Sequence, residues 1–155
     1  MGRWVERVKK WIYFSWTAAQ SIGVEIVYLL DTNIFLEILL QQEKKEECKK
    51  FLTDHIGELY ITDFSLHSLG VILFRYHKSE VFKEFIKDVL PNIKLLTFYM
   101  DLYEELSAVH KKIGLDFDDC YQYLVAKSND LKIVTMDKDF EKVKDVEIIF
   151  LWWII

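Results

Sequence analysis

Five short apolar runs recur along the 155-residue chain, and segments with helical spacing separate most of them. The runs cover residues 27–30, 59–62, 94–97, 132–135 and 146–151. They lack the polar–apolar alternation of strands with one face in water, so each is predicted to be buried on both faces. Such strands form a mostly parallel sheet that helices cover on both sides. The sequence therefore predicts a three-layer α/β/α domain.

The composition is that of a globular protein and narrows the kind of site that the chain can build. A net charge of −5 counts against a strongly basic nucleic-acid binder, but an acidic enzyme site can hold cations. Cys48 and Cys120 lie far apart, match no C-x-x-C pattern and are predicted to be reduced core thiols. Four scattered histidines form no His-rich cage, so any metal ligands are expected to be oxygens, which favours Mg²⁺ or Mn²⁺ over zinc.

Residues 1–24 are predicted to form an amphipathic helical extension, followed by the main domain at residues 25–155. The extension begins with basic residues and continues with an apolar stretch, which also resembles a signal or membrane-surface segment. Polar residues interrupt the stretch too often for a good membrane span. Trp4, Val8, Trp11 and Ile12 share one helix face, which favours packing on the protein. We expect no stable membrane insertion and a cytoplasmic location.

The last five residues, Leu-Trp-Trp-Ile-Ile, would extend an edge strand with large apolar groups. If exposed, they would make an adhesive surface. They are predicted to cover the N-terminal helix or to lie in a subunit interface. The Trp-rich termini therefore predict a homodimer or a larger homo-oligomer.

Oxygen-bearing side chains follow several of the predicted strands. Asp31 ends the first run, Asp63 follows the second, and Thr135 and Asp137 end the fourth. The carboxyl ends of parallel strands meet at one edge of a sheet, where α/β proteins bind their ligands. Carboxylates that are brought together there raise one another's pKa, and a divalent cation relieves the conflict. This edge is therefore a candidate metal site.

A second group of acids begins the predicted helix over residues 117–128. Asp116, Asp118 and Asp119 lie near its first turn, after Gly114 closes the preceding helix. Acids at this place also serve as helix caps and partners of the helix dipole. That role alone does not explain why acids gather both here and at the edge of the sheet. A Mg²⁺ ion between the two groups would explain both.

Three segments resemble the motifs of PIN-domain ribonucleases, a family that includes the VapC-like toxins of toxin–antitoxin pairs. Residues 30–35 (Leu-Asp-Thr-Asn-Ile-Phe) resemble their opening motif. Residues 115–120 (Leu-Asp-Phe-Asp-Asp-Cys), followed by Ala126, resemble the third motif, and residues 133–140 resemble the closing strand and turn. The resemblance covers residues 26–151 and implies a PIN-like fold and metal-dependent cleavage of single-stranded or structured RNA.

The resemblance also implies roles for individual residues. Asp31, Asp119 and Asp137 match the metal-binding and catalytic acids of the family. Substrate-binding or auxiliary roles fall on a further set of polar residues: Asn33, Ser68, Asp116 and Thr135. The implied cofactor is Mg²⁺ or Mn²⁺, the implied substrate is RNA, and a toxin would have an antitoxin protein as its partner.

Ser68 marks a departure from the family pattern, which usually has a glutamate in the helix after the second strand. A hydroxyl is a weaker Mg²⁺ ligand than a carboxylate and is no general base at neutral pH. His67 would point about 100° away around the helix and is predicted to be a surface or packing residue. Asp63 is an alternative source of a carboxylate.

Two other functions stay open at this point. Ser68 and the acidic composition fit a PIN-fold module that binds RNA or protein with weakened catalysis. A phosphatase or nucleotide-binding enzyme on a similar sheet is the other, although neither G-x-G-x-x-G nor G-x-x-x-x-G-K-[ST] occurs. The ribonuclease hypothesis accounts for the acidic motifs, so we prefer it.

Overall fold

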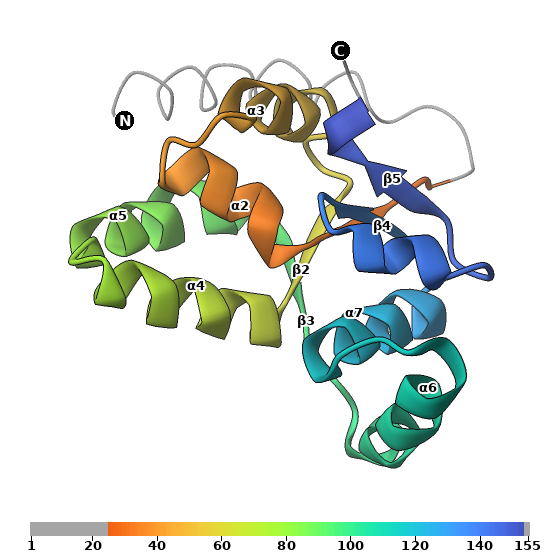
Figure 1. Cartoon of the computed structure of the whole chain (residues 1–155). Coiled ribbons are helices and arrows are strands. Elements are labelled where there is room, and N and C mark those ends of the chain that lie inside the picture. Colours follow the sequence, from red (N-terminus) through yellow and green to blue (C-terminus); the bar gives the residue numbers. More distant parts are fainter. Residues whose placement is uncertain (1–24, 154–155) are drawn as a thin grey trace.

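Five parallel strands form one sheet at the centre of the protein, in the order β3-β2-β1-β4-β5 (Figure 1). The structure is a computed structural model and describes residues 25–153. The strands are β1 (Tyr28–Leu30), β2 (Leu59–Thr62), β3 (Lys94–Leu96), β4 (Lys132–Thr135) and β5 (Ile148–Phe150). Leu29 in the central strand pairs with Tyr60 of β2 and Ile133 of β4. Every pairing is parallel, which confirms the predicted sheet.

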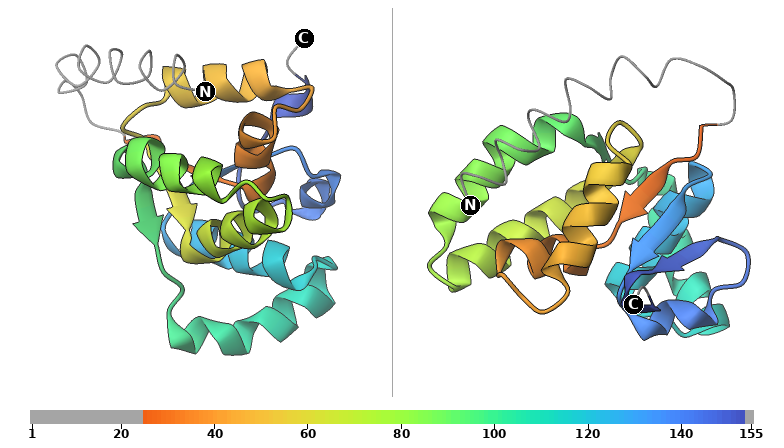
Figure 2. Two further views of the ribbon diagram at one scale, coloured as in Figure 1. Left: turned by 90° about the vertical axis from the view of Figure 1, so that its left-hand side faces the viewer. Right: turned by 90° about the horizontal axis from the view of Figure 1, so that it is seen from above.

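Helices cover both faces of this sheet, as the buried apolar runs predict (Figure 1, Figure 2). One layer holds α2 (Thr32–Leu39), α3 (Lys45–Asp54), α4 (Asp63–Arg75) and α5 (Ser79–Glu84). The other holds α6 (Leu106–Ile113) and α7 (Phe117–Ser128). Leu30 of β1 faces the first core, whereas its neighbour Leu29 faces the second. The three-layer α/β/α fold class is confirmed.

The helical segment after α4 is irregular. The chain forms α5, a π-helical turn at Phe85–Val89 and a 3₁₀ turn at Leu90–Asn92. Ser79 is the first residue of α5, and the N-cap before it is Lys78, which makes no side-chain capping bond. Pro91 lies inside the 3₁₀ turn, where its missing N–H costs little. The packing of Phe85 and Val89 in the core holds this irregular turn in place.

Two glycines shape the ends and the packing of the helices. Gly114 ends α6, as predicted, in the left-handed conformation with a φ of 81°. A Cβ atom at Gly70 would lie 3.4 Å from the ring of Phe82, so α4 and α5 approach closely at this point. Before α6 the chain forms a 3₁₀ turn at Met100–Glu105.

The C-terminal strand is shorter than the expected run over residues 146–151. After β5 the chain turns into a 3₁₀ segment at Leu151–Trp153. Leu151 is buried in the core, and the Lys138 ammonium lies over the ring of Trp152. The predicted extension at residues 1–24 lies outside the described residues, so its predicted packing stays a prediction. Among residues 25–153 no helix has the length and apolar character needed to cross a bilayer.

Candidate metal centre

Asp31 lies between the end of β1 and the start of α2, where it is the N-cap of the helix. Its side chain is 9% exposed. Oδ1 accepts a hydrogen bond from the Thr32 N–H at 2.7 Å. Oδ2 accepts one from the Thr135 hydroxyl at 2.7 Å and one from the Asn33 amide at 3.2 Å. The carboxylate is therefore held by the ends of two neighbouring strands.

Thr135 joins the first and last acidic motifs through one hydroxyl group. Besides donating to Asp31, Oγ1 accepts the Asp137 N–H at 3.0 Å and an Asn33 amide N–H at 3.3 Å. The Asn33 amide oxygen in turn accepts the Met136 N–H at 3.3 Å. These bonds fix the turn after β4 against the start of α2. Asn33 and Thr135 thus position Asp31 and Asp137.

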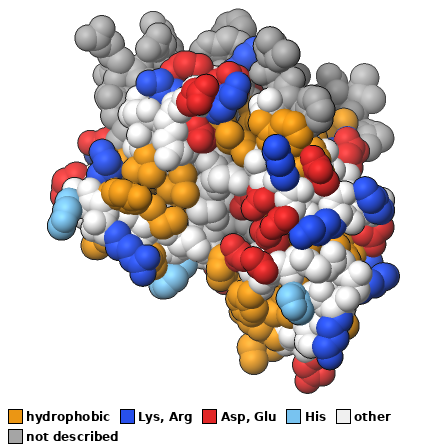
Figure 3. Space-filling view, in the orientation of Figure 1, with side chains coloured by type: hydrophobic (Ala, Val, Ile, Leu, Met, Phe, Trp, Pro, Cys, Tyr) orange, Lys and Arg blue, Asp and Glu red, His pale blue; other side chains and the backbone are white. Residues whose placement is uncertain are grey.

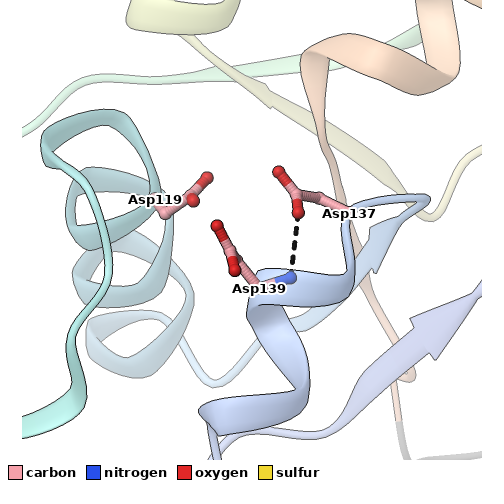
Figure 4. Close-up of side chains that lie close together, drawn as sticks. All are labelled: Asp119, Asp137 and Asp139. Carbon is pink, nitrogen blue, oxygen red and sulfur yellow. Dashed lines mark hydrogen bonds between the residues drawn. The ribbon is translucent and has the colours of Figure 1, made fainter.

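Three further carboxylates face one another beside this turn (Figure 4). Asp119 comes from the first turn of α7, Asp137 from the end of β4 and Asp139 from the 3₁₀ helix Lys138–Lys142. One oxygen of each lies within 4.8 Å of the others. Asp137 also accepts the Asp139 N–H at 2.9 Å, which orients both side chains. The structure therefore brings two of the predicted ligands together and adds Asp139.

The electrostatics of the site disfavour its ionised form. Burial raises the pKa of Asp119 to about 7, and repulsion from neighbouring acids, Asp118 and Asp31 first among them, adds to the effect. Burial likewise raises the pKa of Asp31, against the opposing hydrogen bonds from Thr135 and Thr32. Repulsion from Asp137 also acts on Asp31, so its carboxylate belongs to the same electrostatic cluster. A cation would relieve this repulsion.

The donor set fits a hard divalent cation. All four carboxylates offer oxygen, the ligand atom that Mg²⁺ and Mn²⁺ prefer. Opposite ligands of an octahedral Mg²⁺ ion lie about 4.2 Å apart, twice the metal–oxygen distance of about 2.1 Å. The spread of 4.8 Å among the three facing oxygens therefore needs only a small side-chain adjustment. The site accepts Mg²⁺ or Mn²⁺ by charge, atom type and size.

The other predicted site residues lie around this centre. Asp116 is exposed and, although it stands at the N-cap of α7, makes no side-chain capping bond. Ser68 is half-buried on α4, and His67 is exposed, as expected of a surface histidine. Asp63 accepts hydrogen bonds from the Tyr121 hydroxyl at 2.5 Å and from the Phe64 N–H at 2.8 Å, so its Oδ1 is occupied.

A buried polar network near the site was not predicted from the sequence. Ser65 accepts hydrogen bonds from the Thr32 hydroxyl at 3.0 Å and from the Gln122 amide at 2.5 Å. Its own N–H is bonded to the Thr62 hydroxyl, which caps α4. The network ties α2, α4 and α7 together behind Asp31. The network could not be predicted, because a serine in an apolar helix is not a recognisable sequence signal. Asp139 could have been predicted as a ligand, because it follows Asp137 by two residues.

Comparison with known proteins places this arrangement in a family. A family model of the PIN domain matches residues 28–146. A comparison with curated proteins by sequence finds no match.

Both cysteines are free and buried, as expected of core thiols.

Solved structures with the same fold include a toxin–antitoxin complex and a toxin. A toxin–antitoxin complex from Klebsiella pneumoniae has 20% identity and a TM-score of 0.65, and the match covers 80% of this chain and 97% of that one. FitAcB from Neisseria gonorrhoeae has 24% identity and a TM-score of 0.68, with 83% and 100% covered. VapC20 from Mycobacterium tuberculosis, a sarcin–ricin loop cleaving toxin, has 13% identity and a TM-score of 0.65, with 74% and 92% covered.

At these identities the structural likeness establishes the common fold, and the family model establishes the relationship over most of the chain. The motif order and the carboxylate cluster at the sheet edge agree with it. The protein is a member of the PIN-domain family, with a VapC-like fold.

Proposed function

We propose that this protein is a ribonuclease that hydrolyses RNA phosphodiester bonds with Mg²⁺ or Mn²⁺, and that it is the toxin of a toxin–antitoxin pair. The observation that carries the proposal is the group of facing carboxylates from Asp119, Asp137 and Asp139 beside the buried Asp31. Lys142 lies 3.1 Å from Asp139, but a single ammonium does not compensate four clustered carboxylates, so a further cation would stabilise the group. Membership of the PIN family supplies the reaction class.

In this proposal Asp31, Asp119 and Asp137 hold the ion, and Asp139 is an additional carboxylate. The ion would activate a water molecule and offset the charge that develops on the phosphate. Asp31 is suited to this role because its three hydrogen bonds leave acceptor capacity on Oδ1. The bonds also fix its orientation, so little freedom is lost on metal binding.

The antitoxin part of the proposal rests on similarity to proteins of such systems. VapBC2 from Rickettsia felis, with 18% identity and a TM-score of 0.64, has been solved bound to a DNA fragment from its promoter. For this chain we propose an antitoxin protein partner and a cytoplasmic location. The Trp-rich termini further suggest a homodimer or larger homo-oligomer. Light scattering at micromolar concentration tests the oligomer, because a monomeric mass would refute it.

A second candidate is a PIN-fold module that binds RNA or protein with weakened catalysis. The observation in its favour is Ser68, a hydroxyl where the family usually has a glutamate. Ser68→Glu separates the two candidates. A rise in cleavage rate in this variant would mean that the natural chain is catalytically weakened, and no rise would favour a site complete without the glutamate.

The test of the main proposal measures RNA cleavage and thermal stability with and without Mn²⁺. At a Mn²⁺ concentration of 100 times its Kd, folding gains about 2.7 kcal/mol, which raises Tm by about 5–11 °C for a chain of this size. We expect both the cleavage and the shift in the wild type, and neither in Asp31→Asn.

Asp145→Asn is the matched control. Asp145 lies outside the cluster and pairs with Lys127 at 2.9 Å. This variant should keep cleavage and the Mn²⁺ shift. Undiminished cleavage by Asp31→Asn in Mn²⁺ would refute the proposal.

A further inference from the structure

Aromatic side chains gather next to the acidic centre, along the same edge of the sheet. Acids follow β1 and β4, whereas aromatic residues surround the ends of β2 and β3. Five rings contact one another in a continuous series, which we call the aromatic shelf: Phe117, Phe64, Tyr121, Phe98 and Tyr103. The centroid distances between successive rings are 6.1, 5.3, 4.3 and 4.8 Å.

The shelf has a buried base and an exposed surface. Tyr121 and Phe98 are 2% and 7% exposed and form the base. Phe117 and Tyr103 are 56% and 44% exposed at its two ends. The hydroxyl of Tyr121 donates to Asp63 at 2.5 Å and anchors the base to the start of α4. The exposed rings therefore rest on a fixed support that orders them before a ligand arrives.

The shelf and the carboxylates that would hold the ion are carried by neighbouring elements at the same edge of the sheet. Phe117 is the first residue of α7, and Asp119 lies in the same helical turn. Asp63, which anchors Tyr121, follows β2, the strand beside β1. Figure 3 shows hydrophobic side chains directly beside a group of acidic ones on this face of the molecule. A polymer lying along the sheet edge would meet both.

We propose that the exposed rings of Phe117 and Tyr103 stack on unpaired nucleobases of the RNA whose phosphate lies at the carboxylate cluster. The inference rests on the proposed ribonuclease function and deepens it by naming the residues that would hold the bases of the substrate. Stacking on aromatic rings is a sequence-tolerant way to bind a single strand. In a duplex both faces of an internal base are covered by its neighbours, so the shelf selects single-stranded RNA.

The charge of this face explains why such contacts are needed. Asp116 and Asp118 are exposed beside Phe117, and carboxylates at the site repel phosphate groups. Base stacking supplies attraction without positive charge. It would therefore carry a large share of the affinity for RNA.

Binding of a 12-nucleotide fluorescent single-stranded RNA to Asp119→Asn protein, which should not cleave it, tests the shelf by anisotropy. Stacking of one base is worth about 1–3 kcal/mol, so Phe117→Ala should raise Kd about 5- to 150-fold, and Phe117→Trp should restore it. An RNA duplex of the same sequence should bind weakly to every variant.

Phe74→Ala is the matched control, because Phe74 is also an exposed phenylalanine. It is 60% exposed on α4 and contacts Phe82 at 6.0 Å, much as Phe117 contacts Phe64. This variant should bind the RNA like the parent. An equal loss of RNA affinity in both variants would overturn the proposal, because general surface hydrophobicity would then explain the binding.

Three further outcomes separate the aromatic shelf from its rivals. If the wild type cleaves RNA in Mn²⁺ but Phe117→Ala binds the strand normally, the shelf is wrong and the nuclease stands. If the strand binds through Phe117 but the wild type cleaves nothing, the shelf stands and the nuclease is wrong. If Phe117→Ala turns a dimer into a monomer by light scattering, the rings serve a second copy of the chain and the proposal fails.

Discussion

Neutralising Asp119 should stabilise the metal-free protein at alkaline pH. Burial and neighbouring acids raise the pKa of this carboxyl to about 7 in the folded state, from its ordinary value of 3.8. Between these values the folded protein holds a proton that the unfolded chain has lost, so stability falls as pH rises. Each pH unit between the two pKa values is worth about 1.36 kcal/mol, so the free energy of unfolding falls by about 2.7 kcal/mol between pH 5 and pH 7. Above pH 7 the loss is complete.

Asp119→Asn replaces the titrating carboxyl by a neutral amide of nearly the same shape. At pH 5 the variant and the wild type should differ little, because Asp119 is largely protonated. At pH 8 the variant should melt about 5–11 °C higher, given about 2–4 °C per kcal/mol for a chain of this size. Differential scanning calorimetry in EDTA at pH 5, 6, 7 and 8 measures the gap, and the four histidines cancel in the comparison.

Asp145→Asn is the control for this experiment. The Lys127 ammonium and the Tyr123 hydroxyl lower the pKa of Asp145, so the carboxylate stays ionised from pH 5 to pH 8. The difference in Tm between Asp145→Asn and the wild type should be independent of pH. A gap between Asp119→Asn and the wild type that stays constant over the same range would refute the argument that the acids repel one another in the folded state.

Three other substitutions have expected outcomes from the contacts of the site. Thr135→Val removes a hydrogen bond to the buried Asp31 and should cost about 1–3 kcal/mol in urea denaturation, whereas Thr135→Ser should restore it. Ser65→Ala should cost a similar ~1–3 kcal/mol by the same measurement, since Gln122 loses its hydrogen-bond acceptor, and an unchanged midpoint would contradict this. Gly114→Ala should lose about 1 kcal/mol because φ is 81°, and equal stability of the two proteins would show that the turn relaxes.

The sheet and its layers could be predicted because they depend on hydrophobic pattern. Short apolar runs without alternation can only be buried on both faces, and the helical spacing between them places helices on either side. The ends of the elements depend on packing, which the pattern does not record. Ser79 has the composition of an N-cap, yet Lys78 occupies that place. Core packing of Phe85 likewise set the irregular turn after α5.

The candidate site could likewise be predicted only in part. The place of the site could be predicted because acids at strand ends and helix starts meet at one edge of the sheet. The resemblance to the PIN-domain motifs then singled out Asp119 and Asp137 among these acids. The hydrogen bonds from Thr135 that orient Asp31 needed coordinates, since they depend on the register between β1 and β4. Tyr121 is an aromatic residue that is buried in the core. Phe117 is also aromatic, but it lies at the start of a helix. Only its exposure in the structure distinguishes it from the aromatic residues of the core.

The central position of β1 governs when the candidate metal centre can form during synthesis of the chain. Asp31 leaves the ribosome early, but the hydroxyl that orients it belongs to a residue 104 positions later. Strands this distant in sequence pair slowly, and β4 cannot take its place beside β1 before most of the chain has been made. A nascent chain therefore carries separate parts of the centre and no assembled one. A ribosome would therefore finish nearly the whole chain before the proposed ribonuclease site could form.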